Sequence, residues 1–278
     1  MHAPAKVNLA LHVTGQRDDG YHLLDSIVTF TEFGDRLLFY QSDALTLTVE
    51  GPESDGLPVD DKNLILIAAK ALMAASNNFN LGMHIALEKN LPSASGMGGG
   101  SSNAAATLLA LNELWRLGFS NQKLAEIGLP LGADIPMCLM RENLRAQGTG
   151  ELLEPIELPR TPILLANPRV PVSTPEVFKA LRSRNNAPIH WESMGADMAN
   201  SLASTRNDLE APARILVPVI DDVLGVISQQ QHCQISRMTG SGATCFGLFE
   251  TQSQAENAAH SIQSQNPDWW VVATQTIA

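Results

Sequence analysis

Four glycines and two serines fall within the seven residues from Gly96 to Ser102, and this cluster constrains the chain more than any other stretch. An apolar segment with the pattern of a strand, residues 85–91, precedes it, and leucines at helical spacing follow it between residues 104 and 115. Glycine lets the backbone approach an oxyanion closely, and the free N–H groups at a helix N-terminus favour negative charge. The sequence therefore predicts a phosphate-binding loop that leads into a helix.

The two commonest phosphate-binding loops do not match this cluster. A Walker A loop ends in Gly-Lys-Ser or Gly-Lys-Thr, and no lysine follows Gly100 before Lys123. A dinucleotide fingerprint that starts at Gly96 needs a glycine at position 101, where Ser101 stands. A flexible Gly/Ser linker is the remaining alternative, although linkers seldom run from a strand directly into a strong helix.

The overall charge narrows the classes of partner. The chain has 278 residues and a formal net charge of −11, so we expect neither nucleic acid nor an anionic membrane surface to be bound through its overall field. Three widely spaced cysteines argue against a disulfide framework or a zinc cluster. Lys6 and Asn8 interrupt any signal-peptide pattern, and no apolar run approaches membrane-spanning length, so we expect a cytoplasmic protein.

The predicted elements divide the chain into two α+β domains, residues 1–152 and 153–278, separated by a segment rich in glycine and proline. The first has predicted strands at 5–14, 22–33, 36–50 and 82–91, a turn at Gly34-Asp35, and helices at 63–75, 104–115 and 121–127. The second reads strand 161–167, helix 175–182, helix 212–230 interrupted at Pro218, strands 235–238 and 243–249, helix 253–265 and strand 269–276. Strand, helix, strand, strand, helix, strand is the ferredoxin-like split βαβ order.

Three separated segments carry a family resemblance: Pro4–Leu9, the glycine-rich loop, and Thr239–Thr244. In this order and spacing they resemble the GHMP kinase superfamily. Further stretches are similar to the branch that acts on a cytidine diphosphate-linked methylerythritol in the non-mevalonate isoprenoid pathway: Asp19–His22, Asn63-Leu64, Lys89–Pro92, Leu131–Pro136 and Asn207–Glu210. The loop departs from the family pattern at one point, because Ser95 stands where a glycine is usual.

The resemblance implies a fold and a reaction. The N-terminal domain is expected to be ribosomal protein S5 domain 2-like and the C-terminal domain ferredoxin-like. The expected reaction transfers the ATP γ-phosphoryl group to the 2-hydroxyl of the small-molecule acceptor, with ATP and Mg²⁺ as cofactors. The expected assembly is a monomer or a weak homodimer.

Asp134 and Lys6 are the catalytic residues that the resemblance implies. The acceptor hydroxyl is tertiary and very weakly acidic, so a carboxylate that takes its proton is a direct chemical solution. A nearby cation stabilises the negative charge that develops on the oxygen. The alternatives are a helix-capping or turn aspartate and a solvated lysine. Asn8 is expected to orient either group, or to be an ordinary strand-edge amide.

The remaining site residues are also carried by the resemblance. The ATP phosphates are assigned to the loop, Pro92, Ser93, Ala94, Ser95, Gly96, Met97, Gly98, Gly99, Gly100, Ser101 and Ser102, with Ser101 and Ser102 as candidate Mg²⁺ ligands. The adenosine side is assigned to Asn63, Leu64 and Lys89, which alternatively cap or solvate their elements. The cytidine-linked acceptor is assigned to Asn8, Tyr21, His22, Thr174, Phe178, Gly240 and Gly242.

Two other functions remain open. Another kinase of the superfamily, such as a homoserine or phosphomevalonate kinase, would not need the stacking aromatic of Gly20-Tyr21-His22. A non-catalytic sensor on the same fold would be expected to lose Lys6 or Asp134, and both are present.

Overall fold

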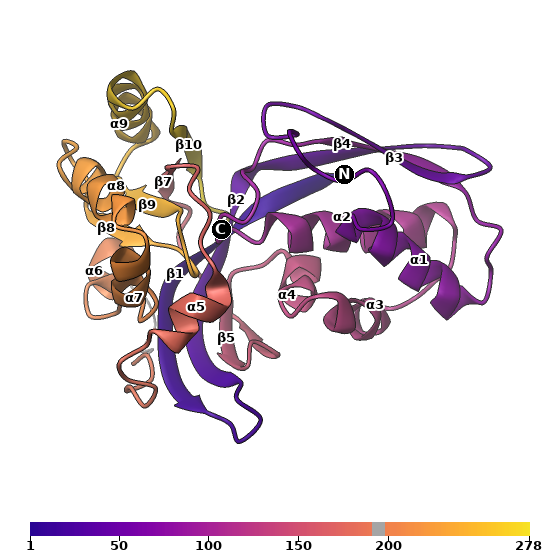
Figure 1. The fold of residues 1–278 in the computed structure, drawn as a ribbon, viewed down its shortest axis with the longest axis horizontal. Helices are drawn as coiled ribbons and strands as arrows, with labels where there is room; N and C mark the ends of the chain where they lie inside the picture. Colours follow the sequence, from indigo (N-terminus) through magenta and orange to yellow (C-terminus); the bar gives the residue numbers. More distant parts are fainter. Residues whose placement is uncertain (191–197) are drawn as a thin grey trace. The chain divides into compact units, whose positions relative to one another are not determined.

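The computed structural model describes residues 1–190 and 198–278, and these residues divide into two compact units whose elements are labelled in Figure 1. The first unit comprises residues 1–5, 34–93 and 98–141, and the second comprises residues 6–33, 94–97 and 142–278. Two long strands, β1 (His2–Gln16) and β2 (His22–Tyr40), each contribute residues to both units. A domain boundary between residues 152 and 153 therefore stays a prediction.

The first unit packs helices against a small sheet. Strand β3 (Leu45–Glu50) pairs in parallel with β4 (Met83–Glu88), and β4 pairs antiparallel with residues 36–40 of β2. The helices are α1 (Leu64–Ser76), α2 (Gly99–Leu114), α3 (Asn121–Gly128) and α4 (Ile135–Met140), with a 3₁₀ turn at Leu129–Leu131. Figure 1 shows these helices together on one side of β3 and β4.

The expected turn at Gly34-Asp35 is wrong. Strand β2 continues through both residues from His22 to Tyr40. A Cβ at position 34 would collide with the carbonyl oxygen of Ala3, so glycine serves here to let two strands approach closely. Asp35 is fully buried, and its side chain binds other parts of the first unit.

Two further differences lie around α2 and α4. Helix α2 begins at Gly99 rather than near residue 104, because glycines and serines in a first turn carry no apolar periodicity. Helix α4 was not predicted, since its six residues are few and Pro136 lies in its first turn. Strands β5 (Leu144–Gly148) and β6 (Leu152–Pro155), which form a hairpin beside residues 24–28 of β2, were also missed.

The second unit contains the predicted ferredoxin-like arrangement. Its four-stranded sheet has the order β10 (Trp270–Gln275), β7 (Pro162–Asn167), β9 (Cys245–Leu248), β8 (Ile235–Met238), and every pair is antiparallel. Helices α8 (Val219–Ser228) and α9 (Gln252–Gln265) pack on this sheet, and Val223, Ile227 and Ile262 fill the core between them. The shorter helices are α5 (Thr174–Lys179), α6 (Met198–Leu202) and α7 (Glu210–Leu216).

The predicted interruption at Pro218 is confirmed, because α7 ends at Leu216 and α8 begins at Val219. Proline removes a backbone donor and clashes with the preceding turn, so one continuous helix is not possible there. In the part of the chain that the structure describes, no helix is both long enough and apolar enough to span a membrane.

Candidate active site

Lys6 lies in β1 with only 6 % of its surface exposed, so it is not a solvated surface lysine. Its ammonium Nζ donates to Asn8 Oδ1 at 3.0 Å. The amide of Asn8 is fixed in turn, since its Nδ2 donates to Ser26 Oγ at 2.8 Å and Ser26 Oγ donates to the Ala10 carbonyl at 2.7 Å. This chain of donors turns the Asn8 oxygen toward the ammonium.

The loop segment 94–97 packs against the third family segment. Thr244 donates from its N–H (3.3 Å) and its hydroxyl (2.6 Å) to the Ser95 carbonyl. Gly96 has φ +78°, and a Cβ there would lie 2.8 Å from the carbonyl oxygens of Thr239 and Gly242. Conversely, a Cβ on Gly240 would lie 2.7 Å from the Gly96 oxygen. Glycine at these positions therefore permits a backbone-to-backbone contact.

Ser95 does not need the conformation of a glycine. The left-handed residues of this segment are Ala94, with φ +50°, and Gly96, whereas Ser95 is not among the residues with positive φ. Its side chain is buried. The following residue, Met97, is also buried, and its carbonyl accepts the backbone N–H of Lys6 at 2.9 Å. The loop segment is thus tied to β1 at the candidate catalytic lysine.

In the first unit, the N-terminus of α2 has the features of an anion site. Gly98 is the N-cap with φ +62°, and no side chain caps the helix there. The first N–H groups of a helix have no partner within it, and they favour an anion. A Cβ on Gly99 would be in van der Waals contact with Leu91 and Lys89, at 3.6 Å. Gly100 is exposed, and a Cβ there would meet only Leu64, at 3.8 Å, so a ligand can approach the backbone at Gly100.

The two candidate metal-binding serines differ in their surroundings. Ser102 is buried and donates to the Pro4 carbonyl at 2.6 Å. Ser101 is half-buried, and its Oγ lies 3.7 Å from the position of a Cβ on Gly132, beside the segment that carries Asp134. Among the described residues there is no group of three or more histidine, cysteine or acidic side chains that could hold a metal ion. Ser101 is therefore the better placed of the two.

Asp134 is the N-cap residue of α4 and is half-buried. The helix-capping alternative requires its carboxylate to accept an N–H from the first turn, and the side chain makes no such bond. The turn is closed by the backbone instead, with the Ile135 N–H donating to the Gly132 carbonyl at 3.0 Å. Asp134 belongs to the first unit and Lys6 to the second.

The adenosine-side candidates have structural partners. Asn63 caps α1, accepting the Ile65 N–H at 3.0 Å, and Leu64 lies 3.8 Å from the position of a Cβ on Gly100. Lys89 is buried in an ion pair with Asp35 at 2.8 Å and also donates to the Leu91 carbonyl. Burial lowers the pKa of Lys89, and the Asp35 carboxylate opposes that shift.

Two of the acceptor-side candidates, His22 and Phe178, stack on each other in the second unit. Tyr21 is 67 % exposed, and the rings of His22 and Phe178 stack with centroids 4.7 Å apart. A base that stacks on Phe178 must take its other face or displace His22. Burial and the Arg184 guanidinium lower the pKa of His22, whose Nε2 is buried without a hydrogen-bond partner. Thr174 Oγ1 lies 2.7 Å from Ser241 Oγ in the third family segment.

Family models match most of the chain: the GHMP kinases N terminal domain at residues 63–142 and the GHMP kinases C terminal domain at residues 177–268. The chain belongs to the GHMP kinase family. A 4-diphosphocytidyl-2-C-methyl-D-erythritol kinase from Dinoroseobacter shibae is 49 % identical, over 98 % of this chain and 93 % of the relative. One from Rhizobium etli is 47 % identical, over 99 % of this chain and 94 % of the relative.

Solved structures of the family agree with the fold. A crystal structure of 4-(cytidine 5′-diphospho)-2C-methyl-D-erythritol kinase matches with a TM-score of 0.84 and 33 % identity, covering 100 % of this chain and 99 % of that one. A homoserine kinase from Cytophaga hutchinsonii matches with a TM-score of 0.68 and 18 % identity, covering 100 % and 93 % of the chains, which shows the shared fold alone. The predicted superfamily, its fold and the kinase class are confirmed.

Sequence reasoning missed two residues that support these family segments. Asp35 accepts hydrogen bonds from Leu91, which precedes the phosphate loop, and from Asn103, which follows it. It was missed because the glycine before it was interpreted as part of a turn. Asn207 is buried and donates to the carbonyls of Met238 and Gly240, at 2.7 and 2.8 Å, which fixes the third segment. The neighbouring Asp208 accepts the Val13 N–H at 2.7 Å, so it anchors β1. The only sequence signal for Asn207 and Asp208 was their place in the family-like stretch Asn207–Glu210.

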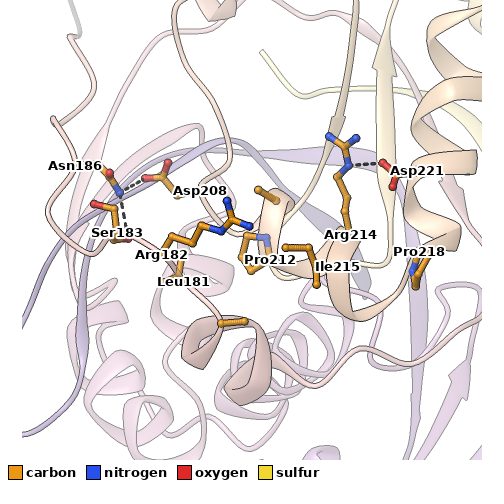
Figure 2. A pocket seen from close by; sticks show the side chains of 12 residues that line it. Leu181, Arg182, Ser183, Asn186, Asp208, Pro212, Arg214, Ile215, Pro218 and Asp221 are labelled. Carbon is orange, nitrogen blue, oxygen red and sulfur yellow. Dashed lines mark hydrogen bonds and ion pairs between the residues drawn. The ribbon is translucent and has the colours of Figure 1, made fainter.

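A separate cavity of about 600 Å³ lies in the second unit between the end of α5, α7 and the start of α8 (Figure 2). None of the predicted site residues lines it. Its two carboxylates already have partners, since Asn186 donates to Asp208 and Arg214 pairs with Asp221, as Figure 2 shows. The cavity is therefore not part of the candidate active site.

Proposed function

We propose that this chain transfers the γ-phosphoryl group of ATP to the 2-hydroxyl of 4-diphosphocytidyl-2-C-methyl-D-erythritol. The observation that carries the proposal is the 47–49 % identity, over nearly the whole chain, to relatives named as kinases of this compound. In the reaction, the acceptor oxygen forms a bond to the γ-phosphorus, and the bond from that phosphorus to the β,γ-bridging oxygen breaks. ADP leaves with that oxygen.

Asp134 is the proposed base. Its carboxylate lies at the start of α4 and makes no capping hydrogen bond to that helix. A tertiary hydroxyl loses its proton only as the new O–P bond forms, and a positioned carboxylate can accept the proton at that moment. The proton that leaves the acceptor therefore ends on Asp134.

Lys6 is the proposed cation at the acceptor oxygen. Its low exposure strengthens its electrostatic effect, because charge interactions are weakly screened away from water. The bond to Asn8 Oδ1 at 3.0 Å directs the ammonium without neutralising its charge. Asn8 is thus proposed to act through Lys6, as a positioning residue.

The ATP triphosphate is proposed to bind the loop of residues 92–98 and the N–H groups at the start of α2. Gly100 is exposed and a Cβ there would meet only Leu64, at 3.8 Å, which leaves room for phosphate oxygens close to the backbone. Mg²⁺ bound with the nucleotide neutralises charge on the transferring phosphates. Ser101 is this chain's proposed hydroxyl ligand to it, since Ser102 is engaged with Pro4.

The cytosine is proposed to contact the aromatic side chains of Tyr21, His22 and Phe178. An exposed tyrosine ring offers a face, and the partnerless His22 Nε2 offers a hydrogen-bonding edge to a base. Thr174, Gly240 and Gly242 are proposed to lie along the diphosphate. This assignment accounts for the aromatic stretch that other acceptors of the superfamily do not require.

We further propose that the chain divides into family domains at residues 1–152 and 153–278, that it is a monomer or a weak homodimer, and that it is located in the cytoplasm. The low count of three separated cysteines supports a reducing compartment. Size-exclusion chromatography with light scattering measures the oligomeric state directly.

A coupled assay of ADP release tests the proposed function. The acceptors are the cytidylyl compound, the same methylerythritol phosphate without its cytidylyl group, homoserine and phosphomevalonate. We expect turnover of the cytidylyl compound with a kcat/KM at least ~100-fold above the others. Equal or faster turnover of homoserine or phosphomevalonate would assign the chain to another kinase of the family, and no turnover of any acceptor would support a non-catalytic sensor.

A further inference from the structure

Asp35 is a fully buried carboxylate that none of the proposed catalytic steps uses. Its Oδ1 accepts the backbone N–H groups of Asn90 and Leu91, at 2.7 and 2.8 Å. Its Oδ2 accepts the Lys89 ammonium at 2.8 Å and the Asn103 amide Nδ2 at 3.0 Å. One carboxylate thus holds four donors in the first unit.

These four donors come from the two ends of the phosphate loop. Residues 89–91 immediately precede the loop, and Asn103 lies in the second turn of α2, which follows it. The Lys89 side chain also donates to the Leu91 carbonyl, which adds a second bond between these residues near the loop. Its Nζ lies 3.6 Å from the position of a Cβ on Gly99, the first residue of α2. Asp35 therefore fixes the strand exit and the helix start with respect to each other.

Stability alone is a weak reason for such an arrangement. Removing two charges from water costs several kcal/mol per ion, and well-packed apolar side chains of similar volume often stabilise a core as well or better. The buried pair between Lys89 and Asp35 does something that an apolar pair cannot, because hydrogen bonds fix direction as well as distance. The N–H groups of a phosphate site must point at the ligand within a narrow range of angles.

We propose that Asp35 is a positioning residue for ATP: it clamps both ends of the phosphate loop so that the first N–H groups of α2 are aimed at the nucleotide phosphates. The inference rests on the proposed function only for the identity of the ligand as ATP. Lys89 and Asn103 act as the two arms of this clamp.

The variant Asp35→Asn divides the clamp. An asparagine keeps one oxygen to accept the N–H groups of Asn90 and Leu91, and it places an NH₂ group against Lys89 and Asn103, which are themselves donors. The matched control is Asp25→Asn in the second unit. Asp25 is equally buried and holds a bidentate ion pair with Arg145 at 2.9 and 2.8 Å.

Isothermal calorimetry of ATP binding to the full chain, with Mg²⁺ present, is the readout. We expect Asp35→Asn to weaken ATP binding by about tenfold or more, as expected when a supporting contact misplaces a site by a fraction of an ångström. We expect Asp25→Asn to lower the melting temperature as well but to change the ATP Kd less than about twofold. The KM for the acceptor should stay within about threefold in both variants.

A second variant covers the case in which Asp35→Asn fails to fold. Asn103→Leu has similar volume and removes only one arm of the clamp, so we expect a folded protein with roughly threefold weaker ATP binding. Unchanged ATP affinity in a folded Asp35→Asn, or in Asn103→Leu when Asp35→Asn does not fold, would overturn the proposal. Wild-type protein that binds ATP but does not phosphorylate the cytidylyl acceptor would contradict the proposed function alone. Wild-type protein that does not bind ATP would contradict both.

Discussion

The ammonium of Lys6 and the amide oxygen of Asn8 are joined by a buried hydrogen bond of 3.0 Å, two residues apart on strand β1. Residues i and i+2 of a strand face the same side, so the pairing follows from the strand itself. Ser26 fixes the other end of the amide at 2.8 Å. A neutral amide therefore helps to set the direction of the Lys6 ammonium.

Substitution of either Lys6 or Asn8 should lower kcat. Lys6→Met should lower kcat by ~10²–10³-fold, because a preorganised donor at the developing charge is lost, while the KM for ATP stays within about threefold. Asn8→Ala should lower kcat by less, on the order of tenfold, since it removes one bond that directs the ammonium and leaves the ammonium itself in place. Lys123→Met, at an exposed surface lysine, is the control and should match the wild type. A rise in the KM for ATP alone would instead make Lys6 a nucleotide ligand.

Two glycines of the loop should respond differently to a methyl group. Gly100 is helical and exposed and has room for a Cβ, so Gly100→Ala should keep its melting temperature but lose ATP affinity by blocking phosphate approach. Gly96 has φ +78° and would place a Cβ 2.8 Å from two carbonyl oxygens, so Gly96→Ala should lose about 1–3 kcal/mol of stability. Thermal melts and ATP calorimetry on both variants separate these effects. Normal ATP binding by folded Gly100→Ala would contradict the phosphate-loop assignment.

The glycine-rich loop before a helix, the ferredoxin-like order and the break at Pro218 could be predicted from the sequence. Each of them leaves a local signature of glycine, proline or periodicity. The role of Asp35 could not be predicted from the sequence, since Gly34-Asp35 has the composition of a turn. The reason for the glycine is its close approach to the Ala3 carbonyl, which only the structure shows. The stack of His22 on Phe178 was also not predicted, because it joins segments far apart in the chain. The candidate site residues were predicted from family motifs, whereas their hydrogen-bond partners could be identified only from the structure.

Tyr21 should matter for the acceptor and not for the fold. Its side chain is 67 % exposed, so Tyr21→Ala should leave the melting temperature within about 2 °C. One lost stack on a base is worth ~1–3 kcal/mol, which corresponds to roughly 5- to 150-fold in affinity for the cytidylyl acceptor. Initial-rate kinetics should show this increase in the acceptor KM, with the KM for ATP unchanged. Tyr40→Ala, an exposed tyrosine of the first unit, is the matched control.

The pKa of His22 predicts a pH dependence. Burial, and then the positive Arg184, disfavour the imidazolium, so the pKa of His22 lies below its ordinary 6.5 and the ring is neutral at pH 7. The acceptor kcat/KM should fall as the pH drops through that lowered pKa. Arg184→Gln removes the repulsion and should move this acid limb to higher pH, whereas Arg182→Gln, two residues away, should not. A limb that stays in place in Arg184→Gln and His22→Ala would assign it to another group.

Phosphorus NMR of the product is the most direct test of phosphoryl transfer to the acceptor hydroxyl with Asp134 as base. Wild-type protein with ATP, Mg²⁺ and the cytidylyl acceptor should yield one new phosphomonoester resonance, with the acceptor diphosphate intact and one ADP formed per product. Asp134→Asn should form that resonance ~10²–10⁴-fold more slowly while still binding ATP. Absence of the phosphomonoester with wild-type protein, or its formation by Asp134→Asn at more than about half the wild-type rate, would contradict the account.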